Sequence, residues 1–507
     1  MQLIFSLLLT LVMILSGTPQ ATPELNYDPD SLVSIKPALR QEIAAAMPAG
    51  MTAYDIDVTI PPADNNAFAE IAGQQTVAYT NVTGEAISQL PFRLYANSLT
   101  ASAPPMTITS AQVNDAEVPV ALSENNSVAT VELGTDLAPG DVIVVDMTFS
   151  LEVGIDDPTH YGILNYDSAS HTAVLAHWYP VVAGRDPVDG WMLDPVSING
   201  DPIFTDAGLY TVTVTIDAGL ELITSGVETD RSENNGQQTV TFAASPSRDF
   251  SIVTSETLVP TTSEVSGTTI TSWAAPHAVD ASTKVAEWTG NTLNIFNPLL
   301  GEYPWVQIQT VQAPIYSAAA VELPQMFVLG TAFFNQQLGF ASYFEFTVAH
   351  EAIHMWFYSL VGNNQYQHAF IDEGITNYLS ADIYFRMMYG DDVGDSTRQR
   401  FLYTDFQRMI EANADVIVDF PTDSFPTASA YVNAVYTKAP LGFAAIHEAM
   451  GSDAFFGGLH QYIADFRFRV ATPADMEAAL QAQTDINVRE MWSHWFERRE
   501  GGLDIRE

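Results

Sequence analysis

Residues that can bind zinc occur at a characteristic spacing near the middle of the second half of the chain. Residues 350–354 are His-Glu-Ala-Ile-His, an H-E-x-x-H motif, and Glu373 follows after eighteen intervening residues. On a helix, side chains four residues apart lie on one face, so His350 and His354 could bind the same zinc ion. A catalytic zinc has three protein ligands and one open position, and Glu373 would be the third ligand. Glu351 would accept the proton of the attacking water, so the spacing predicts zinc-dependent hydrolysis.

Other zinc classes place their third ligand elsewhere. The metzincin spacing would put it at Leu360, which has no ligating atom, and the thermolysin spacing would put it at Gly374, which cannot ligate. His368 could bind a metal in principle, but it falls in a predicted loop, where we expect a surface histidine. A chance match is the remaining alternative for H-E-x-x-H, and the presence of only ten histidines in the chain argues against it.

The composition excludes several classes of function. The chain has 507 residues, with 61 Asp and Glu against 18 Lys and Arg, which gives a formal net charge of −43. Such a surface repels nucleic acids and anionic membranes, so we expect no nucleic-acid partner. The absence of cysteine excludes disulfides, thiolate metal sites, a cysteine nucleophile and a lipid anchor on an N-terminal cysteine. The composition does not predict an oligomeric state.

The beginning of the chain is predicted to be an export signal. Residues 1–16 form an apolar run and residues 17–21 are small or turn-forming, which is typical of a signal peptide and too short for a comfortable membrane span. Because no Lys or Arg precedes the run, an uncleaved anchor within residues 1–21 is the alternative. We therefore expect an exported protein that is extracellular, periplasmic or at the cell surface. Residues 22–50 contain several prolines and are expected to form a linker with one short helix near residues 38–46.

Residues 51–260 have the pattern of an all-β domain. This stretch is rich in Thr and Val, alternates in short runs and has turn signals about every ten residues. The clearest predicted strands are residues 76–80, 142–150 and 209–217. We predict a sandwich or a saddle-shaped sheet that is mostly a scaffold without chemistry of its own.

The pattern changes to a helical period in residues 261–507. One apolar strand is expected near residues 319–329. The H-E-x-x-H motif would lie in the middle of a long helix at the floor of a cleft, and Glu373 near the start of the next helix. The predicted fold class is therefore α+β and multidomain, with an all-β N-terminal domain followed by a mainly helical domain that contains the zinc motif. Amphipathic runs predict helices at residues 281–296, 343–361, 375–388, 442–450 and 473–483.

These motifs resemble the gluzincin aminopeptidases, the group of aminopeptidase N and the leukotriene hydrolases. The sequence HEAIHMWF from His350, with Glu373 in Asp-Glu-Gly, carries the resemblance. Upstream, AAVEL at residues 319–323 takes the place of that family's G-x-M-E-N strand and keeps only the glutamate. Downstream, VYTKA at residues 435–439 resembles the family's tyrosine segment, and HWYP at residues 177–180 is similar to part of its N-terminal domain.

The resemblance implies a thermolysin-like zinc metallopeptidase domain and a role for each site residue. One zinc ion would be held by His350, His354 and Glu373. Glu351 would act as general base and then general acid. Tyr436 would donate its hydroxyl to the oxyanion of the tetrahedral intermediate, and the nearby Tyr431 is the competing candidate.

Two further residues would serve the substrate and the metal site. Glu322, on an edge strand, would bind the free α-ammonium of a peptide while the strand aligns the peptide backbone. Asn377, one turn after Glu373, would orient a metal ligand. Since the sequence ends at Glu507, the resemblance implies a short, two-domain, bacterial-like member without the helical domain that covers the site in longer relatives.

We predict a zinc metallopeptidase that removes N-terminal residues from peptide substrates. Ala319, Val321 and Leu323 replace the family's Gly, Met and Asn, so a zinc endopeptidase or an epoxide-type hydrolase on the same fold is the alternative. A non-catalytic binding or scaffold relative is the weakest hypothesis, because such a protein would be expected to have lost Glu351 or a ligand. The sequence does not predict the side-chain preference or the natural substrate.

Overall fold

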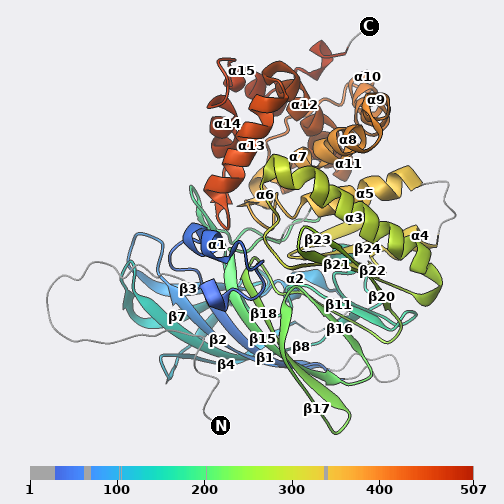
Figure 1. The fold of residues 1–507 in the computed structure, drawn as a ribbon. Coiled ribbons are helices and arrows are strands. Elements are labelled where there is room, and N and C mark those ends of the chain that lie inside the picture. Colours follow the sequence, from blue (N-terminus) through green and yellow to red (C-terminus); the bar gives the residue numbers. More distant parts are fainter. Residues whose placement is uncertain are drawn as a thin grey trace.

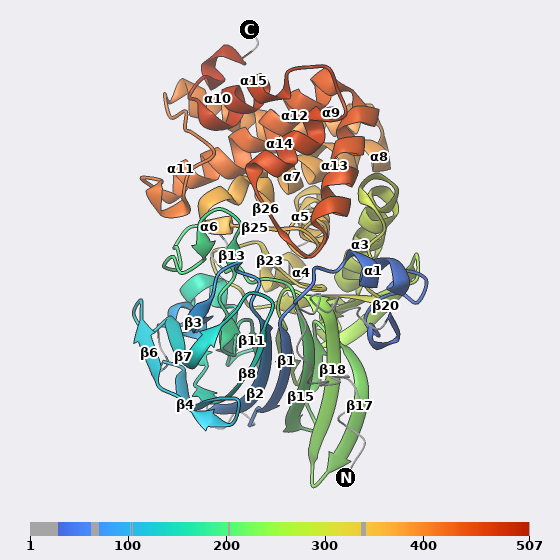
Figure 2. The ribbon, with the colours of Figure 1, turned by 90° about the vertical axis from the view of Figure 1, so that its left-hand side faces the viewer.

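The protein has a β-rich part and a helical part. The computed structural model describes residues 29–61, 70–101, 103, 105–200, 203–335 and 341–505. Figure 1 shows the sheets below and the helices above, and Figure 2 shows the same two layers from the side. This arrangement confirms the predicted fold class. The predicted signal segment lies outside the described residues.

The largest sheet of the β-rich part has eight strands in the order β17-β18-β15-β1-β2-β8-β4-β5. Strands β1 and β15 are parallel, and the other neighbouring pairs are antiparallel. In β15, Tyr210, Val212 and Val214 are buried, whereas the threonines between them are half-buried, as expected for a sheet with one face on a core. The three predicted strands are confirmed within β2, β8 and β15. The strands are β1 (Ala53–Thr59), β2 (Ile71–Thr80), β4 (Thr107–Val113), β5 (Ala116–Glu117), β8 (Val142–Leu151), β15 (Gly208–Asp217), β17 (Val227–Asn234) and β18 (Gln237–Ser247).

Two smaller sheets share one apolar core with the large sheet. Their orders are β16-β19-β11-β10-β9 and β12-β3-β7-β6, and β13 and β14 form a separate hairpin. Leu90, Val145 and Trp178 are fully buried where the sheets meet. The strands are β3 (Ile87–Arg93), β6 (Val120–Ser123), β7 (Val128–Leu137), β9 (Gly154–Ile155), β10 (Leu164–Asp167), β11 (Thr172–Leu175), β12 (Val181–Val182), β13 (Arg185–Asp186), β14 (Gly190–Trp191), β16 (Glu221–Thr224) and β19 (Ile252–Ser255).

The helical part contains a five-stranded sheet, so the prediction of a single strand near residues 319–329 was wrong. Two antiparallel strands occupy that stretch, because the chain turns at Gln325, which has φ of 59°. The sheet order is β20-β21-β22-β24-β23, which leaves β23 at an edge. The other three strands precede this stretch; their sequences contain many Thr, Ser and Gln residues, and these strands were not predicted. The strands are β20 (Val259–Val265), β21 (Thr268–Ala274), β22 (Gln307–Ala313), β23 (Ala320–Leu323) and β24 (Met326–Gly330).

Helices cover this sheet and build the rest of the helical part. Helix α3 packs against β20, β21 and α5. A π-helical turn at 379–384 joins α7 to α8 in one continuous helical run. Among the described residues, none of the helices is both long enough and apolar enough to cross a membrane. The main helices are α3 (Val279–Leu300), α5 (Ala341–Ile353), α7 (Glu373–Tyr378), α8 (Phe385–Tyr389), α9 (Asp391–Arg398), α10 (Thr404–Glu411), α11 (Ala428–Val432), α12 (Ala439–Met450), α13 (Ser452–Phe466), α14 (Pro473–Gln481) and α15 (Val488–Trp492). The short helices are α1 (Arg40–Ala46), α2 (Ala96–Leu99), α4 (Thr331–Phe334) and α6 (Gln365–His368).

The segment before the β-rich part packs against the helical part. Leu32, Ile35 and Ile43 are buried in the same core as α3 and α5. Lys36 donates its backbone N–H to the Pro304 carbonyl at 2.9 Å. Helix α1 coincides with the short helix predicted there. The division of the chain at residues 50 and 260 stays a prediction, and β20 already belongs to the sheet of the helical part.

Candidate active site

The H-E-x-x-H motif lies at the end of a helix, not in its middle. Helix α5 ends at Ile353, and the Trp356 N–H bonds to the Ile353 carbonyl at 2.9 Å as the chain turns back. Tyr358 has φ of 120°, which no helix allows. The predicted helix at residues 343–361 was therefore eight residues too long at its C-terminal end. The apolar residues after His354 are buried by the surrounding core, so their apolar character did not require a helix.

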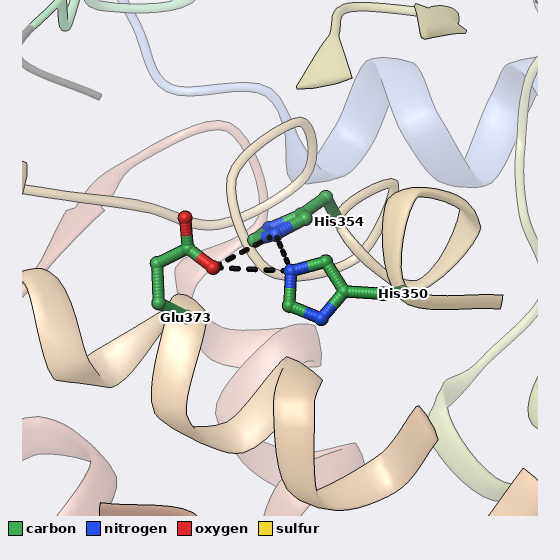
Figure 3. Close-up of side chains that lie close together, drawn as sticks. All are labelled: His350, His354 and Glu373. Carbon is green, nitrogen blue, oxygen red and sulfur yellow. Dashed lines mark hydrogen bonds and ion pairs between the residues drawn. The ribbon is translucent and has the colours of Figure 1, made fainter. Parts of the chain in front are cut away.

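Three side chains meet in a buried triangle (Figure 3). His350 Nε2 lies 3.1 Å from Glu373 Oε2 and 3.1 Å from His354 Nε2, and His354 Nε2 lies 3.4 Å from Glu373 Oε2. Two ligand atoms bound to one tetrahedral zinc are separated by about 3.3 Å, given the usual zinc–nitrogen and zinc–oxygen distances. All three residues are buried, and among the described residues they form the one His/Asp/Glu group with metal-binding geometry. The group is compatible with one zinc ion.

The turn after α5 orients His354. Its Nδ1 lies 3.0 Å from the Phe357 carbonyl oxygen. Because a carbonyl oxygen can only accept, Nδ1 carries the proton in the neutral imidazole, and the Nε2 lone pair points into the triangle. Burial acts to lower the pKa of His354, but the charge and hydrogen bond of Glu373, together with the charges of Glu351 and Asp372, outweigh it and raise that pKa to about 10. A proton must therefore leave this group when a metal binds.

Glu373 begins α7, and its neighbours position it. The side chain of Asp372 caps the helix by accepting the Glu373 backbone N–H at 2.7 Å, and Gln365 donates to the same carboxylate at 2.8 Å. Burial, reinforced by the charge of Glu373, raises the pKa of Asp372 to about 7. Burial would also raise the pKa of Glu373, but the two imidazoles hold it well below its ordinary value. At Gly374 a Cβ would lie 2.7 Å from that of Ala439, so α7 packs closely on α12.

The structure brings the two predicted catalytic residues to the triangle. Glu351 follows His350 in the last turn of α5 and is buried. Tyr436 donates its hydroxyl to Glu373 Oε1 at 2.6 Å, whereas the competing Tyr431 has its hydroxyl next to Gly200. This contact distinguishes the two tyrosines, which spacing alone did not.

Asn377 contacts the tyrosine segment. Its amide donates to the Tyr436 carbonyl at 2.7 Å. Burial lowers the pKa of His350, and a hydrogen bond with Asn377 acts in the opposite direction. Asn377 thus lies between the tyrosine and a predicted metal ligand. His368 does not join the group, because its Nδ1 lies 2.5 Å from Asp419 Oδ1 and its ring is partly exposed.

Glu322 lies on the edge strand β23, as predicted, and its side chain is buried. Strand β23 packs against α5. A cavity of about 20 Å³ beside Glu322 is lined from the β-rich part by His160, Tyr161 and His177 and from the helical part by Tyr358.

Sequence reasoning assigned no site role to these four cavity residues, of which His177 was noted only as part of the HWYP motif, nor to Gln365 and Asp372. The position of Asp372 directly before the helix that begins at Glu373 is a capping signal that could have identified it. His160 and Tyr161 of the β-rich part carry no comparable local signal. His160 and Tyr161 have φ of 42° and 65°, a strained pair of the kind that clusters at functional sites.

The comparisons with known proteins agree with this geometry. Residues 278–495 match the family described as the peptidase family M1 domain. The M1 zinc metallopeptidase from Deinococcus radiodurans superposes with a TM-score of 0.64 over 89% of this chain and 94% of that chain, at 18% sequence identity. A mutant of that protein with a bound Tyr-Ser-Ala substrate aligns with the same coverage, TM-score and identity.

A curated relative is similar over a shorter stretch. The membrane alanyl aminopeptidase of Heliothis virescens is 26% identical over 150 residues, which cover 28% of this chain and 14% of that protein. The structural likeness shows the fold, and the family match spans the three triangle residues together with Glu322 and Tyr436. Residues 278–495 therefore match the peptidase family M1 domain, and a β-rich N-terminal part precedes them in the chain.

Proposed function

We propose that the protein is a zinc aminopeptidase that removes N-terminal residues from peptides. The observation that carries this proposal is the buried triangle of His350 Nε2, His354 Nε2 and Glu373 Oε2, whose atoms have the separations of ligands around one zinc ion. The match of this segment to the peptidase family M1 domain supports the reaction class.

The surrounding side chains supply the remaining chemistry. When bound, zinc would polarise the scissile carbonyl and activate the attacking water. The Glu351 carboxylate takes the proton of that water and returns it to the departing amine. The Tyr436 hydroxyl, held at the triangle by its bond to Glu373, donates a hydrogen bond to the oxyanion as the tetrahedral intermediate forms.

The position of Glu322 favours peptide substrates with a free α-amine. Its carboxylate is buried on the edge strand β23 and lines a small cavity between the two parts of the molecule. A carboxylate at this place could accept charge-assisted hydrogen bonds from the α-ammonium of a peptide. The tripeptide bound to the Deinococcus protein is a ligand of the same class.

The test compares one peptide with its N-acetylated twin, using the zinc-loaded protein and mass spectrometry. An aminopeptidase trims the free-amine peptide one residue at a time and leaves the twin intact. Glu322→Gln should raise KM for the free-amine peptide with a smaller effect on kcat. Equal cleavage of both peptides would instead indicate an endopeptidase, and no cleavage of either peptide would refute peptidase activity.

We also propose that the protein is exported, on the basis of the apolar run at residues 1–16. Expression of the full chain with N-terminal sequencing of the mature protein tests this. A new N-terminus close to residue 21 in the extracytoplasmic fraction is expected, whereas an intact Met1 in a membrane fraction would indicate an uncleaved anchor.

A further inference from the structure

Arg248 is a fully buried cation at the junction of the two parts of the molecule. It lies in the β-rich part, between β18 and β19. Its guanidinium donates to four main-chain carbonyls, those of Thr205, Tyr358, Leu360 and Arg469. Three of these acceptors belong to the helical part, so one side chain of the β-rich part holds two separate segments of the helical part.

Two of the acceptors lie in the turn that orients the metal ligand His354. The Ser359 N–H bonds to the His354 carbonyl at 3.0 Å, and the Phe357 carbonyl is the partner of His354 Nδ1 at 3.0 Å. Between them stands Tyr358, whose φ of 120° is strained for a residue with a side chain. Such a conformation persists where surrounding contacts impose it, and the bond from Arg248 Nε to the Tyr358 carbonyl is such a contact.

The backbone around the guanidinium leaves no spare room. At Gly362 an added Cβ would lie 2.5 Å from Arg248 Cζ and 2.6 Å from Nη1. Gly362 belongs to the short strand β25 (Gly362–Asn363), which pairs with β26 (Val470–Ala471). The planar guanidinium of arginine can donate at once to the Leu360 carbonyl before β25 and to the Arg469 carbonyl before β26. A lysine ammonium does not have this geometry.

The guanidinium remains charged in this environment. Burial lowers the pKa of Arg248 to about 10, while Asp206 acts to raise it. Burying a cation among carbonyl groups costs free energy unless each donor is satisfied, and three of its nitrogens make hydrogen bonds here. A side chain selected for stability alone would be expected to be apolar at such a place.

We infer that Arg248 is a positioning residue for the metal site: by bonding the Tyr358 and Leu360 carbonyls it fixes the turn that aims His354 Nε2 at the triangle. The inference rests on the proposed function, since it assumes that His354 is a zinc ligand. Removal of groups that orient a metal-bound histidine typically weakens metal affinity about 10–100-fold.

The test measures metal binding directly. Arg248→Lys keeps the charge and loses the planar guanidinium, and Gly362→Ala keeps the arginine and displaces it. The matched control is the variant Arg93→Lys. Arg93 is also a buried arginine of the β-rich part, and it donates to the main-chain carbonyls of Met192 and Asp194. For each variant, Zn²⁺ affinity is measured by chelator competition, the Co²⁺ absorption spectrum is recorded, and the Tm of the metal-free protein is determined.

We expect Zn²⁺ affinity to fall about 10–100-fold in both Arg248→Lys and Gly362→Ala, with a changed Co²⁺ spectrum. Arg93→Lys should keep the wild-type affinity and spectrum even where its Tm falls. If Arg248→Lys does not fold, Gly362→Ala decides the matter by the same readouts. Folded variants with wild-type affinity and spectrum would overturn the inference and leave the proposed function intact. Failure of the unmodified protein to bind Zn²⁺ would overturn both.

Discussion

The eight-stranded sheet and the segment from residue 345 to residue 382 both contribute side chains to buried cores, but they bury different groups. Among the described strands of the sheet, no Asp, Glu, His, Lys or Arg side chain is buried. The segment buries seven Asp, Glu and His residues, namely Glu345, His350, Glu351, His354, Asp372, Glu373 and Asp382. Because a buried charge costs several kcal/mol unless it is paired, such a density in one segment indicates a functional site. The sheet supports the fold, and the segment carries the chemistry.

The largest expected effect comes from the segment. Glu351→Gln should lower kcat by at least about 100-fold, because a general base contributes about 10²–10⁴-fold. Zn²⁺ content and Tm should stay near the wild-type values, since Glu351 is not one of the triangle residues. Steady-state kinetics with an aminoacyl substrate, alongside metal analysis, checks this. Turnover at the wild-type rate would show that another group is the base.

Tyr436→Phe should have the next largest effect. Loss of one hydrogen-bond donor to an oxyanion costs about 100–1,000-fold in kcat, while KM should change little. The control is Tyr431→Phe, whose hydroxyl lies next to Gly200 instead of the triangle. If both variants lost the same activity, the assignment of Tyr436 over Tyr431 would be wrong.

A substitution that creates a cavity in the core of the sheet should lower the stability of the protein and leave its catalytic rate unchanged. Ile216 of β15 is fully buried, and Ile216→Ala is expected to lower the free energy of unfolding by about 2–5 kcal/mol. Below the new Tm, kcat should remain at the wild-type value. Denaturant unfolding and kinetics on the same sample test this. A large loss of kcat in the folded variant would contradict the separation of the two regions.

The smallest effect is a pH dependence of stability in the helical part. Burial lowers the pKa of His447 to about 4 from its ordinary 6.5, and Arg398 and Arg386 act in the same direction while Glu448 opposes. The unfolded chain therefore binds a proton between pH 6.5 and pH 4 that the folded protein does not, so stability falls as the pH falls through this range. Tm measured against pH should show this slope, and His447→Gln should reduce it. The control is His277→Gln, which changes an exposed histidine and should leave the slope unchanged. If the slope also stayed unchanged in His447→Gln, other groups would cause the pH dependence.

Local patterns predicted the parts of the site that depend on local geometry. The spacing of His350, His354 and Glu373 predicted the triangle, because a helix fixes which side chains share a face. The end of α5 was missed, since the apolar residues that follow it are buried by distant parts of the core. Arg248 could not be found, because its acceptors are main-chain carbonyls 110 and 221 residues away, which have no signature in the sequence.

The packing of residues 29–50 on the helical part makes that part discontinuous in sequence. Leu32, Ile35 and Ile43 come before the β-rich part in the chain, yet they complete the core that holds α3 and α5. In terms of chain order, the β-rich part is an insertion within the helical part. A fragment starting near residue 261 would lack these side chains and expose the apolar residues that they cover, so it should aggregate or require the N-terminal peptide added in trans. Isolation of the helical part therefore calls for deletion of the β-rich part, with a linker that joins residues 29–50 to the helical part.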